Sequence, residues 1–226
     1  MHFEVLVEDQ SGKAMLEILF PKIIGPNHTF KVIDYKGIGR IPQNLQSGTD
    51  TSHRFLLEQL PRLLRAYGKT FAEYGKANYQ AAVIVVCDLD DKCLKLFRQE
   101  LLSILAACPQ APETRFCIAV EEGEAWLLGD LPAVTGTYPQ ARQTVLRQYK
   151  NDSICNTWEC LADAVYPGGH EALKKQGWRT VGEQKSIWAK SIAPRMDIGN
   201  NQSPSFRHLC DKIQDLAQTR GNVENE

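Results

Sequence analysis

Four acidic residues follow short apolar runs, and their carboxylates could serve together as the oxygen ligands of a metal ion. They are Glu8, Asp88, Asp90 and Glu124. Carboxylate oxygens are preferred ligands of hard divalent cations such as Mg²⁺. Such a cation can generate a nucleophilic water and neutralise charge on a phosphoryl transition state. The sequence therefore predicts a metal-dependent site built on these acidic residues.

The spacing of Asp88 and Asp90 has two interpretations. If the extended backbone continues past Cys87, both side chains point to the same side and can reach one metal ion. Acidic residues also commonly cap helices that follow strands, and Asp91 is equally suited to that position. The Asp-x-Asp pattern alone leaves metal binding and helix capping equally open.

The apolar runs that precede these residues predict the strands of a parallel sheet. Strands are expected over residues 3–7, 30–35, 81–87 and 116–120, and the unbroken apolar run at 81–87 is typical of a buried central strand. Helical spacing between the runs predicts helices over 14–24, over 53–74 with a kink or break at Pro61, and a third ending at Leu105 with Leu94 facing inward. This alternation indicates an α/β fold with right-handed crossovers. Ligands of such sheets bind at the C-terminal ends of the strands, where the acidic residues lie.

The pattern changes after Asp130 and becomes helical and less regular. We expect residues 1–130 to form an α/β domain and residues 131–226 to form a helical extension that packs on it and is not independent. Ser203 and Pro204 fit the N-cap and first position of a final helix. The other interpretation of Ser203-Pro204-Ser205 is a helix N-terminus that binds phosphate.

Composition gives no further specific signal. The net charge of −1 provides no overall electrostatic indication of nucleic-acid binding. The seven cysteines are odd in number and show no CxxC spacing, which favours small buried thiols in a reducing cytoplasm over disulfides or zinc ligands. The chain lacks a long apolar stretch, so we expect a cytoplasmic protein.

Two strand ends resemble the TOPRIM superfamily, the catalytic module of topoisomerases, primases and overcoming-lysogenization-defect nucleases. They read Val-Leu-Val-Glu, ending at Glu8, and Val-Val-Cys-Asp-Leu-Asp, ending at Asp90. The chain is more specifically similar to the small bacterial TOPRIM-like family catalogued as domain of unknown function 4276. The similar stretches are 5–11, 84–91 with 118–130, and 192–197 with 203–206. TOPRIM proteins often have glycine after the first glutamate, whereas this chain has Asp9. This difference affects the expected geometry of the local turn and the role expected of Glu8.

The resemblance implies a TOPRIM/Rossmann-like sheet and a nuclease that depends on Mg²⁺ or Mn²⁺. By analogy, Asp88 and Asp90 bind metal, and Glu8 binds metal or acts as a general acid and base, with a pKa raised by its carboxylate neighbours. Glu124 and Glu121 complete a second metal site. The implied partners are a nucleic-acid substrate, DNA rather than RNA, and a separate ABC-type ATPase in phage or plasmid defence, since this chain has no ATP-binding loop of its own.

Two further groups of residues each have a structural and a functional interpretation. Lys185, Lys190 and Arg195, with Trp188 between them, fit a strip that grips phosphate or, more commonly, a solvated helix face. Trp126 fits a packing residue under the sheet edge better than a residue that stacks on a base.

Two other functions remain open from the sequence. A phosphatase of the haloacid-dehalogenase type also uses strand-DxD, but Lys92 stands where threonine or valine is usual, and Glu8 would be unexplained. The other alternative is a non-catalytic TOPRIM-like interaction module.

Overall fold

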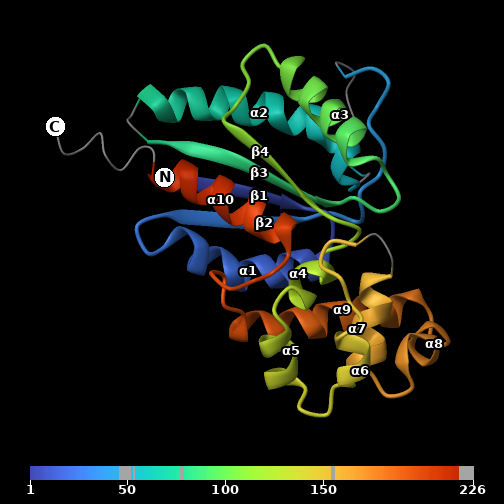
Figure 1. Ribbon diagram of the computed structural model, residues 1–226. Coiled ribbons are helices and arrows are strands. Elements are labelled where there is room, and N and C mark those ends of the chain that lie inside the picture. The colour runs from blue at the N-terminus through green and yellow to red at the C-terminus, as the bar shows by residue number, and fades with distance from the viewer. Residues whose placement is uncertain (46–51, 53, 77–78, 154–155, 219–226) are drawn as a thin grey trace.

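Four parallel strands form the central sheet of the computed structural model (Figure 1). The central strands are β1 (His2–Val7) and β3 (Ala81–Asp88), with β2 (Thr29–Asp34) beside β1 and β4 (Thr114–Ala119) beside β3. The predicted α/β fold with a parallel sheet is confirmed. The structure describes residues 1–45, 52, 54–76, 79–153 and 156–218.

Strand β3 shows why this sheet must be covered on both faces. Its alternate residues Ala82, Ile84 and Val86 belong to one buried cluster. The intervening residues Val83, Val85 and Cys87 belong to the other. An unbroken apolar run is what a strand between two layers of helices requires, because successive side chains point to opposite faces.

Helices cover the two faces unequally (Figure 1). One face packs against α2 (Leu56–Lys76) and α3 (Leu94–Ala106). The opposite, larger cluster includes side chains from α1 (Gln10–Ile24), α9 (Trp178–Ile192) and α10 (Pro204–Gln218). The last two helices come from the C-terminal half of the chain, so that half joins α1 in forming the layer on this side of the sheet.

Two details of the helices differ from the predictions. The predicted break at Pro61 is absent, because α2 continues through it. Pro61 is the sixth residue of α2, so the helix continues past it without the one backbone hydrogen bond that its missing N–H would have donated. Leu94 was expected to face inward but is 44% exposed, since it is the first residue of α3. His53, where the helix was expected to begin, lies outside the described residues.

The C-terminal half is helical, as predicted. Between β4 and α9 lie five short helices: α4 (Glu124–Leu128), α5 (Leu131–Thr137), α6 (Gln143–Leu146), α7 (Thr157–Val165) and α8 (Gly169–Lys174). The 3₁₀ turn η1 (Ala193–Arg195) follows α9. Among the described residues, no helix combines the length and the apolarity that crossing a bilayer would require.

The final helix begins where the sequence predicts. Pro204 is the first residue of α10, and the hydroxyl of Ser203 accepts a hydrogen bond from the N–H of Phe206 at 3.3 Å. Asp152 accepts hydrogen bonds from the N–H of Ser205 at 2.6 Å and from the Ser203 hydroxyl at 2.7 Å. A carboxylate of the protein itself therefore satisfies the start of this helix, which favours the structural interpretation over phosphate binding.

The cysteines follow the prediction with one clear exception. Cys87, Cys108, Cys117 and Cys210 are buried, and Cys160 is half-buried. Cys93 is exposed where α3 begins, so the expectation that every cysteine is buried is wrong there. Cys155 lies outside the described residues.

Candidate functional site

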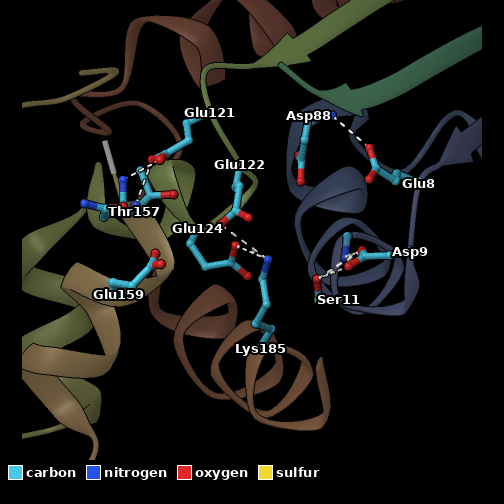
Figure 2. Close-up of polar contacts among 12 residues, drawn as sticks. Glu8, Asp9, Ser11, Asp88, Glu121, Glu122, Glu124, Thr157, Glu159 and Lys185 are labelled. Atoms are coloured by element: carbon cyan, nitrogen blue, oxygen red, sulfur yellow. Dashed lines mark hydrogen bonds and ion pairs between the residues drawn. The ribbon is translucent and has the colours of Figure 1, made fainter. Parts of the chain in front are cut away.

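Glu8 and Asp88 meet at the C-terminal edge of the sheet (Figure 2). Strands β1 and β3 are parallel neighbours, with Val7 beside Val86 in register, so both strands end at the same edge. The Oε2 atom of Glu8 accepts a hydrogen bond from the backbone N–H of Asp88 at 3.2 Å. The fold therefore joins two predicted site residues that are far apart in the sequence.

Asp9 explains the departure from the glycine that is usual after the first glutamate. Its side chain caps α1 by accepting a hydrogen bond from the N–H of Gly12 at 2.7 Å. The hydroxyl of Ser11 also donates to this carboxylate, at 2.8 and 3.0 Å to its two oxygens. Asp9 thus fixes the start of α1 beside Glu8, and the positive end of the helix dipole favours negative charge there.

Asp90 does not lie beside Asp88 in the way that extended backbone would place it. Strand β3 ends at Asp88, and Asp90 adopts a left-handed conformation with φ of 51°. Its carboxylate pairs with the ammonium of Lys92 at 2.6 Å. The condition on which a shared metal site was predicted, extended backbone past Cys87, is therefore not met.

Glu124 lies in the interior with a lysine partner. It is the first residue of α4 and only 3% exposed. The ammonium of Lys185, from α9, lies 3.0 Å from its Oε2 atom and 3.5 Å from Oε2 of Glu122 (Figure 2). Lys185 is therefore neither on a solvated helix face nor in a surface strip, because its side chain is 13% exposed and surrounded by carboxylates.

Glu121 points away from Glu8 and Asp88 and caps a helix (Figure 2). Its carboxylate accepts hydrogen bonds from the N–H of Thr157, at 2.7 Å, and from the N–H of Asn156, at the start of α7. Unpaired N–H groups at a helix start attract carboxylates. The structure gives Glu121 this capping position, apart from the edge where Glu8 and Asp88 meet.

Glu122 is the site residue that the sequence analysis missed. It lies in the run Glu121-Glu122-Gly123-Glu124. This run shows that several acidic residues follow β4, but it does not indicate which of them face inward. Its side chain is 23% exposed and approaches Lys185 together with Glu124. The only indication of Glu122 in the sequence is that three glutamates occur within four residues after β4.

The remaining members of the predicted basic strip are separated from Lys185 by their surroundings. Lys190 and Arg195 are exposed, whereas Trp188 is buried, with 1% of its surface accessible. A continuous strip of three basic side chains with an interleaved tryptophan therefore does not form. Lys190 and Arg195 remain surface cations with no contact to the acidic edge that the structure records.

Trp126 is a packing residue, as the preferred interpretation holds. It is fully buried, its ring lies 5.7 Å from that of Phe206, and its Nε1–H donates to the Ser205 hydroxyl at 2.9 Å. A side chain enclosed in this way has no face available to a nucleotide base.

Burial and mutual repulsion raise the pKa values of the acidic residues. Burial, followed by the charges of Asp90 and Asp9, raises the pKa of Glu8 to about 7, although the N–H of Asp88 opposes the shift. Burial and the charge of Glu8 raise the pKa of Asp88 well above its usual range, with Lys185 opposing. Burial also raises the pKa of Glu122 to about 7. This edge therefore carries more carboxylates than its internal cation balances.

The arrangement fits one divalent cation better than a closed metal cage. Among the described residues, no three His, Cys, Asp or Glu side chains are grouped closely enough to enclose a metal ion. Mg²⁺ commonly binds through one or two carboxylates and keeps several waters, so a site on Glu8 and Asp88 would match its usual number of protein ligands. A cavity of about 20 Å³ adjoins Asp88, Asp9 and Glu124, which is space for about one water molecule or small ion.

The raised pKa of Glu8 predicts that the metal-free protein loses stability as the pH rises. Between the unfolded value near 4.5 and the folded value of about 7, the folded state binds more protons than the unfolded state. The free energy of unfolding then falls with pH, by up to about 1.4 kcal/mol per pH unit for each such carboxyl. Urea unfolding in EDTA at pH 5 to 8 measures this slope.

Glu8→Gln provides the matched control for this measurement. Glutamine keeps an oxygen for the N–H of Asp88 but cannot titrate, so its stability should fall less steeply over the same pH range. The difference between the two curves cancels the contributions of histidines. Parallel curves for the two proteins would show that Glu8 titrates normally.

One comparison with known proteins gives a match over nearly the whole chain. The sequence profile of the family described as "Domain of unknown function (DUF4276)" matches residues 7–214. The matched region includes Glu8 and all the acidic residues that follow β3 and β4. Neither a curated protein nor a solved structure matches the chain.

Proposed function

The chain belongs to the DUF4276 family, and from the acidic edge of its sheet we propose that it is a metal-dependent nuclease. The observation that carries this proposal is the meeting of Glu8 and Asp88 at the ends of β1 and β3. Two half-buried carboxylates with raised pKa values, at the ends of neighbouring strands, favour a bound cation, which would relieve their repulsion. Catalytic edges of parallel α/β sheets lie at the same ends of the strands.

The proposed division of work gives Asp88 and Glu8 different tasks. Asp88 would be the principal ligand of Mg²⁺ or Mn²⁺, and the bound ion would supply charge neutralisation for the phosphodiester and activate a water. Glu8 has one carboxylate oxygen tied to the N–H of Asp88, which orients the side chain. A carboxyl with a pKa of about 7 is suited to accept and return a proton near neutral pH, so its other oxygen, Oε1, would act as the general base.

The finer features of the proposal come from the TOPRIM resemblance. A TOPRIM relation would make the substrate DNA rather than RNA, and would pair the chain with a separate ABC-type ATPase in defence against phages or plasmids. The order of the first-strand glutamate and the third-strand aspartate supports this relation. The Asp90–Lys92 pair does not, since it takes the second aspartate of the pattern away from Asp88.

A non-catalytic interaction module is the second candidate, and one observation favours it. Of the five acidic residues predicted for the site, three are paired with a lysine or cap a helix: Asp90 and Glu124 pair with lysines, and Glu121 caps α7. A binding module would need these contacts only for its shape. The two candidates differ in whether the protein turns over a phosphodiester.

Cleavage assays decide between the candidates. Purified protein is incubated with supercoiled DNA, linear DNA and RNA in Mg²⁺ or Mn²⁺, with and without EDTA, and with and without a candidate ABC-type ATPase. We expect cleavage that requires the divalent ion and stops in EDTA. If no cleavage above background occurs in any of these mixtures, the nuclease proposal is wrong. Hydrolysis of a simple phosphomonoester without nucleic-acid cleavage would instead support the phosphatase alternative.

A further inference from the structure

The ammonium of Lys185 lies between the carboxylates of Glu122 and Glu124, which follow β4 at the C-terminal edge of the sheet (Figure 2). It lies 3.0 Å from Glu124 and 3.5 Å from Glu122, and its side chain is 13% exposed. Burial alone would lower the pKa of Lys185, but the charges of Glu124, Glu122 and Asp88 outweigh this effect and raise it. Lys185 therefore carries its positive charge at any physiological pH.

The side chains expected to complete a second metal site are engaged elsewhere. Glu124 pairs with Lys185. Glu121 accepts two N–H groups at the start of α7. Releasing Glu124 would leave a buried ammonium without its closest partner, and releasing Glu121 would expose the unpaired N–H groups of a helix start, so both changes are costly.

We propose that Lys185 takes the place of a second divalent cation, so that this site binds one metal ion and not two. This inference rests on the proposed function for the first ion, which lies with Glu8 and Asp88. Lys185 comes from α9, at the far end of the family match, and reaches the carboxylates that follow β4. The C-terminal half of the chain thereby supplies a fixed cation to the edge formed by the N-terminal half.

The charges and the available space agree with a single ion. Three carboxylates, those of Glu124, Glu122 and Asp88, act on the Lys185 ammonium, and Glu8 adds a fourth beside Asp88, which leaves an excess of negative charge that one divalent ion can offset. The cavity between Asp88 and Glu124, which Glu8 does not line, has a volume of about 20 Å³, so it has room for no more than about one small ion. A second divalent ion at Glu124 would lie close to the Lys185 ammonium and would be repelled by it.

Counting bound Mn²⁺ tests this inference without any measurement of catalysis. Isothermal titration and equilibrium dialysis of the full chain with Mn²⁺ at pH 8 should give one ion per chain. Lys185→Met, which keeps the length of the side chain and removes its charge, should raise the count to two. A count of two in the wild type, or of one in a folded Lys185→Met variant, would overturn the inference. A count of zero in the wild type would overturn it as well.

Two further variants keep the test decisive. Lys190→Met changes an exposed lysine on the same helix and should leave the count at one. Glu124→Gln should also leave it at one, because Glu124 pairs with Lys185 and not with the metal; this variant decides the question if Lys185→Met does not fold. A loss of bound Mn²⁺ in Glu124→Gln would overturn the inference.

The outcome is separable from that of the proposed function. If one ion binds, the count rises to two in Lys185→Met and no substrate is cleaved, the assignment of Lys185 stands and the nuclease proposal fails. If the protein cleaves nucleic acid while binding two ions, the nuclease proposal stands and the assignment of Lys185 fails.

Discussion

Asp88→Asn is expected to lower the rate of metal-dependent phosphodiester cleavage by about a thousandfold or more. The half-buried carboxylate of Asp88 is the principal candidate ligand, and asparagine has a similar shape but lacks the charge that attracts the cation. A correctly placed cation contributes several kcal/mol to the transition state, and each 1.36 kcal/mol corresponds to about tenfold in rate. Initial rates of DNA cleavage at saturating Mg²⁺ measure the effect.

Asp91→Asn is the matched control for this substitution. Asp91 lies in the same turn after β3 and is exposed, so removal of its charge should change the rate less than about threefold. Equal rates for the two variants would contradict the assignment of Asp88. A second readout comes from urea unfolding in EDTA at pH 8, where Asp88→Asn should be at least as stable as the wild type, because it removes a carboxyl whose ionisation is opposed by burial and by the charge of Glu8.

The positions of Glu8 and Asp88 could be predicted because they follow from backbone periodicity. Each residue terminates a strand whose apolar pattern is visible in the sequence, and neighbouring parallel strands must end at the same edge. The unbroken run from Ala81 onward also identified the central strand. Patterns of this kind report on local conformation and on burial, and both were strong enough here to locate the edge.

The partners of the other acidic residues could not be predicted in the same way. Asp90 departs from the expected position because it adopts a left-handed conformation itself. Aspartate tolerates this conformation, but its presence in a sequence does not predict it. Glu121 and Glu124 lie three residues apart, yet one caps α7 and the other pairs with Lys185. These choices depend on where α7 and α9 dock, and docking is decided by contacts between distant segments that periodicity does not encode.

The sequence assigned Lys185 to the surface for a similar reason. A lysine in a polar stretch of a helix is most often solvated, and only the packing of α9 against α1 and α4 brings it to the carboxylates. The sequence feature that indicates a buried cation is the run of glutamates after β4, which supplies the partners of Lys185. An excess of acidic residues at a buried strand end requires a cation, either from the protein or from solution.

Trp126→Ala should destabilise the protein by about 3–5 kcal/mol, the usual cost of deleting a large buried aromatic side chain. Trp126 is fully buried, packs against Phe206 and donates a hydrogen bond to Ser205, so the substitution leaves a cavity between α4 and α10 and removes one hydrogen bond. Because α4 begins with Glu124, loosening it should also disturb the contact with Lys185. Urea unfolding at constant pH measures the loss.

Trp178→Ala is the matched control, because Trp178 is 73% exposed and its removal should cost less than about 1 kcal/mol. Trp126→Phe separates the two parts of the Trp126 contribution, since phenylalanine retains much of the packing and lacks the Nε1–H. If Trp126 acted by stacking on a base, Trp126→Ala would weaken binding of single-stranded DNA while leaving stability almost unchanged. The buried position requires the reverse order of effects, with stability lost first and binding affected only through the displacement of α4.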